Sequence, residues 1–178
     1  GQFVSGMLGW QEYACAGRGA MVSGLPPGAT LTQPLSVLGI TGVTAYFGLL
    51  HVGKPKEGET VVVSAAAGSV GSIVGQIAKI KGCKVIGIAG GKDKCNWLTS
   101  ELGFDAAVDY KDGATYKALR AAAPKGIDVY FDNVGGDILE ACIALMNNRG
   151  RIACCGAISQ YDGVPSAHGP RGVPGLIV

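Results

Sequence analysis

The sequence predicts an α/β protein built on a doubly wound parallel sheet. Short apolar runs alternate with amphipathic helical segments between residues 60 and 155, and glycines fall at the junctions. The run TVVVSAAAGSVG at 60–71 passes from a β-branched strand through small residues into a helix. Alternating β and α segments at this spacing require parallel strands with right-handed crossovers.

The strands are expected where β-branched or apolar residues run together, and the helices where apolar residues recur three and four apart. Strands are expected at 60–64, 83–89, 106–109, 127–132 and 151–155, and helices at 70–81, 92–102, 116–123 and 137–146. The first helix is expected to turn one apolar face inward, formed by Val70, Ile73, Val74, Ile77 and Ile80. Gly71 and Gly75, four residues apart, are expected to let that helix pack closely on the sheet.

The residues before this alternation do not follow its pattern. Residues 1–35 hold two expected short strands, at 2–10 and 11–13, followed by a turn-rich segment, and we interpret them as the remnant of another domain. Residues 36–59 carry apolar residues at helical spacing and then a polar loop, and we interpret them as linker helices. The domain proper is then expected to cover 60–178.

The two ends of the chain carry further expectations. The chain begins at Gly1 rather than at Met, so we expect a cut or processed chain. The tail 161–178 is rich in Gly and Pro, and a six-stranded dinucleotide fold would still need a helix and a last strand after it. We therefore expect the chain to stop inside its domain, lacking the last elements.

Composition narrows the class of protein. A chain of 178 residues can bury one full core, and 48% hydrophobic with 16% charged residues is not a disordered composition. The net charge is +2 without a long basic run, so no nucleic-acid partner is expected. Neither a membrane span nor a signal peptide is expected, which favours a cytoplasmic protein.

The cysteines do not form a metal-binding pattern. None of the six stands in a C-x-x-C pair, and Cys154 and Cys155 are neighbours that cannot easily share one tetrahedral ion. His51 and His168 are isolated. We expect no metal site, and free thiols in a reducing compartment.

The turn after the first strand of the alternation carries a phosphate-binding pattern. Ala66, Gly68 and Gly71 occupy the three glycine places of G-x-G-x-x-G, where small residues allow a tight turn and a close backbone approach. The N–H groups of Ser69, Val70 and Gly71 would point at an anion from the positive end of the helix. The pattern predicts a bound dinucleotide.

The end of the second strand of the alternation predicts which dinucleotide. An NAD site carries an acidic residue there, whereas this chain has two glycines followed by Lys92, Asp93 and Lys94. Room and positive charge favour the 2′-phosphate of NADP(H). Two alternatives stay open: solvated lysines in the first turn of a helix, or Asp93 as the ribose acceptor.

Other strand ends supply further candidates. Tyr110 follows the third strand, where it could lie against the adenosine phosphate or be a surface aromatic residue. Asn133 follows the fourth, where it could bind the ribose or nicotinamide half or only cap a turn. The backbone of Cys155, Gly156, Ala157, Ile158 and Ser159 could meet the nicotinamide carboxamide, with Tyr161 near the mouth of the cleft.

Several of these segments together resemble one family. They are AAAGSVG at 65–71, AGGKDK at 89–94, LGFDAAVDY at 102–110, YFDNVGG at 130–136 and GRIACCGAIS at 150–159, with GWQEYA at 9–14 and GITGVTAYFGLL at 39–50. The chain resembles the zinc-independent medium-chain dehydrogenases/reductases, and within them the NADPH-dependent alkenal/one oxidoreductases. That branch includes leukotriene B4 12-hydroxydehydrogenase/prostaglandin reductases, plant double-bond reductases and bacterial curcumin reductase.

The resemblance implies a fold and a set of site residues. The fold is a Rossmann-type domain preceded by a fragment of a GroES-like catalytic domain. The family's phosphate turn maps to Gly68–Gly71, and its nicotinamide loop to Cys155–Tyr161. The other mapped positions are a 2′-phosphate lysine, an adenosine-side tyrosine, a strand-four asparagine and a helix residue near the nicotinamide: Lys94, Tyr110, Asn133 and Thr44.

The resemblance also implies a reaction. NADPH reduces a C=C bond conjugated to a carbonyl in a small enone or alkenal, with hydride going to the β-carbon and a hydroxyl supporting the enolate oxygen. The catalytic residues stay unassigned, because Tyr46 and Tyr161 are better explained as packing or cofactor residues. The full-length protein is expected to be a homodimer that pairs through the last strand of this domain.

Three other functions were weighed against this one. NADPH:quinone reduction uses the same domain without zinc. A non-catalytic dinucleotide-binding module is a second alternative, because the isolated fragment is expected to be inactive. A methyltransferase also places a glycine turn after its first strand, but it would want an acid where this chain has Gly90 and Gly91.

Overall fold

The computed structural model describes residues 1–161, and the predictions for the rest of the tail lie outside the described residues. The chain divides into two compact units, Gly1–Val43 and Thr44–Val178. The predicted roles of 1–35 as a domain remnant and of 36–59 as a linker stay predictions.

The first unit holds a two-stranded antiparallel ribbon. Strand β1 (Val4–Gly6) pairs with β2 (Val22–Gly24), with Val4 opposite Gly24. A short 3₁₀ helix, η1 (Gln33–Leu35), follows. The predicted strand at 11–13 is wrong, because Gly9 takes a φ of +78° and the chain bends at 10–12 instead of staying extended.

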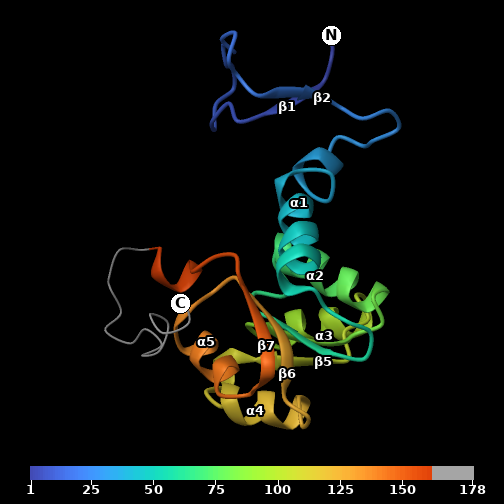
Figure 1. Ribbon diagram of the computed structural model, residues 1–178. Helices are drawn as coiled ribbons and strands as arrows, with labels where there is room; N and C mark the ends of the chain where they lie inside the picture. The colour runs from blue at the N-terminus through green and yellow to red at the C-terminus, as the bar shows by residue number, and fades with distance from the viewer. Residues whose placement is uncertain (162–178) are drawn as a thin grey trace. The chain divides into compact units, whose positions relative to one another are not determined.

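The second unit is a five-stranded parallel sheet in the order β5-β4-β3-β6-β7, which confirms the predicted fold class (Figure 1). Its strands are β3 (Thr60–Val63), β4 (Lys84–Ala89), β5 (Ala106–Asp109), β6 (Ile127–Asp132) and β7 (Met146–Cys154). Val62 of β3 lies opposite Ile86 on one side and Tyr130 on the other.

Four helices connect the strands and cover both faces of the sheet. They are α2 (Ser69–Ile80), α3 (Lys92–Ser100), α4 (Thr115–Ala122) and α5 (Gly136–Ile143). Successive strand residues point to opposite faces. Val61 and Val63 therefore join a core with Val74 of α2, whereas Val62 joins a second core with Leu119 of α4 and Cys142 of α5.

Two predicted details of these elements are wrong. Strand β7 begins at Met146 rather than at 151, and α5 ends at Ile143, because Met146 pairs with Ile127 ahead of an irregularity in the register. Ile80 does not face inward but is 84% exposed. The buried face of α2 runs through Val74 and Ala78, and Ile80 lies about 200° around the helix from Ala78.

The helical segment before the sheet packs on strands β6 and β7. Helix α1 (Ile40–Phe47) continues into a π-helical turn, η2 (Gly48–Gly53). A Cβ on Gly48 would lie 2.8 Å from the Phe131 ring of β6, so only glycine allows this approach. Among residues 1–161, no helix is long and apolar enough to cross a membrane.

Candidate dinucleotide-binding site

The carboxyl ends of all five parallel strands lie at one edge of the sheet, which is where open α/β sheets bind ligands. The predicted site residues other than Thr44 lie in the segments that directly follow the strands. They follow β3, β4, β5, β6 and β7 as Gly68–Gly71, Lys94, Tyr110, Asn133 and Cys155–Tyr161. Thr44 lies half-buried in α1, one turn before Gly48, whose Cβ position would meet the Phe131 ring near the end of β6.

The phosphate turn leaves backbone donors free at the start of α2. Gly68 caps the helix, and its carbonyl accepts the first intrahelical bond from the N–H of Ser72 at 3.0 Å. The N–H groups of Ser69, Val70 and Gly71 precede that bond, so they have no partner within the helix. These are the three donors that the sequence predicts for an anion.

The same turn is tight and strained. Ala65 adopts a positive φ of 46°, and its carbonyl accepts from the N–H of Gly68 at 2.9 Å. A Cβ on Gly71 would lie 2.4 Å from that carbonyl oxygen. Gly71 is therefore required by the close approach of the helix to the turn.

The loop after β4 is held by a carboxylate from the neighbouring strand. Asp109 Oδ1 accepts from the N–H of Gly91 at 2.9 Å and from the N–H of Lys111 at 3.0 Å. These two hydrogen bonds lower the pKa of Asp109, which keeps it ionised. Sequence reasoning did not assign Asp109. The feature that could have indicated it is its place as the last residue of β5, the strand that pairs with β4.

Tyr110 lies against the open side of this loop. A Cβ on Gly90 would lie 2.9 Å from the Tyr110 hydroxyl, so the missing side chain makes room for the ring. Lys92 and Lys94 are exposed in the first turn of α3. Cations at the positive end of a helix are unfavourable. An anion bound between them would offset that repulsion.

The turn after β6 is organised by a second carboxylate that sequence reasoning did not assign. Asp132 is buried, and its Oδ1 accepts from four donors. They are the Tyr130 hydroxyl at 2.7 Å, the Ser64 hydroxyl at 3.2 Å and the N–H groups of Val134 at 3.0 Å and Gly135 at 2.9 Å. Burial raises the pKa of Tyr130, so its hydroxyl stays protonated and donates.

Asn133 is tied to the end of β3. Its Nδ2 donates to the Ser64 carbonyl at 2.7 Å, and its backbone N–H donates to the Ser64 hydroxyl at 2.9 Å. One N–H of the amide is thus engaged within the protein. Its side-chain oxygen and the second N–H of its amide remain for a ligand.

The loop after β7 folds onto the β6 turn. The N–H groups of Cys155 and Gly156 donate to the Asp132 carbonyl at 2.8 and 3.0 Å. Those of Ile158 and Ser159 donate to the carbonyls of the same turn, both at 3.2 Å. These N–H groups are therefore used within the protein.

The two tyrosines weighed as enolate-supporting groups lie in different surroundings. Tyr46 is exposed in α1 and packs edge-on against Phe47, with ring centroids 5.3 Å apart. Tyr161 is exposed, and its hydroxyl accepts from the N–H of Ala157 at 3.2 Å. Tyr46 thus contacts a neighbouring aromatic ring, and the Tyr161 hydroxyl contacts the loop after β7.

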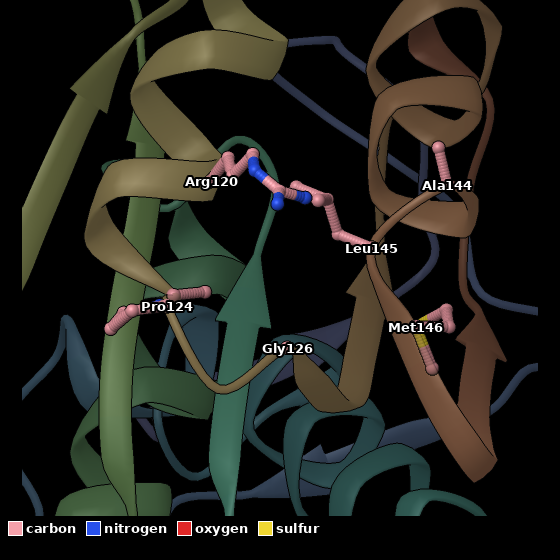
Figure 2. Close-up of a pocket in the computed structure, with 7 residues that line it drawn as sticks. Arg120, Pro124, Gly126, Ala144, Leu145 and Met146 are labelled. Atoms are coloured by element: carbon pink, nitrogen blue, oxygen red, sulfur yellow. The ribbon is translucent and has the colours of Figure 1, made fainter.

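A pocket of about 340 Å³ lies at the opposite edge of the sheet (Figure 2). Gly126, which precedes β6, and Met146, which begins β7, both line it, together with Arg120 of α4. It contains none of the predicted site residues. The pocket is thus separate from the candidate site.

The chain belongs to the zinc-binding dehydrogenase family, whose model matches residues 69–168. Within the medium-chain dehydrogenases/reductases it belongs to the alkenal/one oxidoreductase branch. NADPH-dependent curcumin reductase of Escherichia coli is 45% identical over 177 residues, 99% of this chain and 51% of the relative. Prostaglandin reductase 1 of Mus musculus is 49% identical over 175 residues, 96% of this chain and 53% of the relative.

A solved structure supports the same grouping. CurA from Vibrio vulnificus in complex with NADPH superimposes with a TM-score of 0.85 at 46% identity, covering 94% of this chain and 50% of CurA. The chain spans about half the length of the curated relatives it matches. Despite the family's name, residues 1–161 contain no group of three or more His, Cys, Asp or Glu side chains that could hold a metal ion.

Proposed function

We propose that this chain is the NADP(H)-binding part of an oxidoreductase that reduces the C=C bond of small α,β-unsaturated aldehydes or ketones. The observation that carries the proposal is the carboxyl edge of the sheet. There a helix with free N–H groups stands beside a glycine loop that has lysines where an NAD site has an acid. The similarity to curcumin and prostaglandin reductases supports the reaction class.

The residues at this edge fit such a cofactor. The N–H groups of Ser69, Val70 and Gly71 would bind the pyrophosphate, and the missing side chain of Gly90 lets Tyr110 lie close to the loop after β4. Lys94 would bind the 2′-phosphate and Tyr110 would lie against the adenosine half. The side-chain oxygen of Asn133 and the backbone of Cys155–Tyr161 would orient the nicotinamide half.

When bound, NADPH supplies the hydride for the β-carbon of the alkene. The part of this chain is to orient the cofactor and to exclude water from the edge of the sheet. Thr44 is proposed as a further contact on the nicotinamide side. The group that protonates the α-carbon stays unassigned.

The whole protein is proposed to contain a catalytic domain, of which 1–35 is a remnant and 36–59 the linker, and to form a homodimer. The two alternatives, quinone reduction and dinucleotide binding without catalysis, are distinguished from this reaction by one activity assay. NADPH oxidation by a full-length protein that contains this chain would be followed with alkenals, enones and quinones. Turnover of quinones alone would contradict the proposed reaction.

The cofactor assignment is tested first, in the chain itself, by titration with NADPH and NADH under nicotinamide fluorescence. We expect a preference for NADPH that falls about tenfold in Lys94→Ala, because one charged contact to phosphate is lost. Lys125→Ala is the matched control, since Lys125 is an exposed lysine next to Gly126 at the opposite edge of the sheet. Equal binding of NADPH and NADH would instead favour Asp93 as a ribose acceptor.

A further inference from the structure

Lys111 lies beside the glycine loop after β4, although the sequence pattern of that loop does not include it. It belongs to a short 3₁₀ turn, η3 (Tyr110–Asp112), which follows β5. Its Cε lies 3.0 Å from the position that a Cβ on Gly90 would occupy, and its ammonium is one bond further along. Tyr110 closes on the same position, so two consecutive side chains cover Gly90.

The backbone of Lys111 is fixed to this loop by a shared acceptor. Asp109 Oδ1 holds the N–H of Lys111 and the N–H of Gly91, so the 3₁₀ turn and the loop are joined through one atom. Gly91 has a φ of +96°, a conformation that favours glycine. The base of the Lys111 side chain is therefore positioned relative to Gly90 and Gly91.

The ammonium group itself is available to a ligand. The salt bridges between described residues are Lys79–Asp105 and Arg151–Glu59, so Lys111 forms none within residues 1–161. Asp109, two residues before it, uses its Oδ1 to accept from backbone N–H groups, and the next residue, Asp112, is exposed. Lys92 and Lys94 follow the same loop along the chain, in the first turn of α3.

We propose that Lys111 is a specificity-determining residue whose ammonium binds the 2′-phosphate of NADPH, together with Lys94. This inference rests on the proposed function, because the ribose of the cofactor lies at the end of the second strand of the fold. A phosphate monoester carries a charge near −2 at neutral pH and has three acceptor oxygens. One lysine cannot neutralise it. Lys92 and Lys94 both belong to the first turn of α3, and Lys111 supplies a further cation from an independent element.

The test uses adenosine 2′,5′-bisphosphate and adenosine 5′-monophosphate, which differ only in the 2′-phosphate. Calorimetric titration of the chain with both nucleotides gives an affinity ratio that reports the 2′-phosphate contact alone. We expect Lys111→Gln to weaken the bisphosphate about tenfold and to leave the monophosphate within about twofold. Lys111→Arg should retain most of the ratio, and Lys125→Gln should leave it unchanged.

Each other outcome is decisive. If Lys111→Gln lowers the affinity for both nucleotides equally, Lys111 only supports the loop and the proposal is overturned. The proposal is also overturned if neither affinity changes. If the affinity ratio falls in Lys94→Gln but not in Lys111→Gln, the NADP(H) assignment stands and the proposed role of Lys111 is rejected. No preference for the bisphosphate in the unchanged chain would reject the NADP(H) assignment, and the role of Lys111 with it.

Discussion

The ring of Phe104 occupies the space that a side chain on Gly75 would need. A Cβ on Gly75 would lie 1.9 Å from Phe104 Cζ, and the Phe104 side chain is only 4% exposed. Gly75 lies on the buried face of α2, and Phe104 precedes β5. The missing Cβ is what lets the helix after the phosphate turn pack against this ring.

Gly75→Ala should therefore destabilise the protein, although alanine is the better helix former. The better helix propensity of alanine would stabilise the protein by about 1 kcal/mol. Overpacking a rigid core typically costs about 1–3 kcal/mol, because the new methyl group must displace the Phe104 ring. We expect a net loss of up to about 2 kcal/mol in the free energy of unfolding. Urea denaturation monitored by circular dichroism measures it.

Two further variants check the cause of that loss. Phe104→Leu in the Gly75→Ala background should recover part of the stability, since a smaller side chain leaves room for the methyl group. Gln76→Ala, at an exposed position of the same helix, should change stability by less than about 0.5 kcal/mol. A Gly75→Ala variant as stable as the parent would contradict the packing argument.

The ion pair between Arg151 and Glu59 should make stability depend on acidic pH. Arg151 Nη1 donates to Glu59 Oε1 at 3.0 Å, and Arg151 also donates to the carbonyls of Gly53 and Lys54. The hydrogen bond from Arg151 holds the pKa of Glu59 below its ordinary value of 4.5. The unfolded chain therefore takes up a proton at a higher pH than the folded chain does.

The stability that Glu59 contributes is thus present at neutral pH and is lost as the pH falls below 4.5 through the folded pKa. Glu59→Gln should cost about 1–2 kcal/mol at pH 7, and its difference from the parent should shrink in acid. Urea denaturation at pH 7 and at about pH 4 compares the two. Glu57→Gln, an exposed neighbour, is the control, and an equal loss in both variants would refute the role of the ion pair.

The sequence predicted the central elements well because their residues leave few alternatives. Strands β5 and β6 have the predicted bounds, since both are short apolar runs between polar or glycine boundaries. The start of β7 was missed because MNNRG is typical of a turn. Its pairing depends on the partner strand, through the N–H of Ile127 donating to the Leu145 carbonyl at 2.9 Å.

The candidate site could be predicted in part, for a related reason. Parallel topology brings strand ends to one edge, so residues that follow strands can be named from the sequence alone. The acceptors that hold the loops could not be named. Asp109 accepts hydrogen bonds from the loop after β4, and Asp132 joins the β6 turn to Ser64, 68 residues away in the sequence. Predicting these contacts requires knowing which strands are neighbours in the sheet.

The hydrogen bond from Tyr130 to Asp132 should set how stability responds to alkaline pH. Burial raises the pKa of Tyr130 above its ordinary value of 10.0, so above that pH the unfolded chain ionises this group while the folded chain does not. The contribution of Tyr130 is present at neutral pH and is lost as the pH rises past 10.0. A phenylalanine at position 130 cannot ionise, so it would remove this dependence on pH.

Tyr130→Phe should therefore be less stable than the parent by about 1–2 kcal/mol at pH 7, because a buried carboxylate loses one of its donors. The difference should narrow at about pH 10.5, where only the parent is penalised. Urea denaturation at both pH values measures it. Tyr116→Phe, at an exposed position, should show neither effect, and a difference for Tyr130→Phe that does not vary with pH would count against this account.

Ala65 stores strain at the phosphate turn that glycine would release. Its φ of +46° is in the left-handed region, which costs an L-residue roughly 1–2 kcal/mol, whereas glycine adopts it freely. Ala65→Gly should raise the free energy of unfolding by up to about 1 kcal/mol, after the added entropy of the unfolded chain is offset. Ala67, two residues on, has no positive φ, so Ala67→Gly should lower it by about 0.5–1 kcal/mol. Thermal and urea denaturation of the pair measure the sign, and destabilisation of similar size in both variants would show that the turn holds no strain at Ala65.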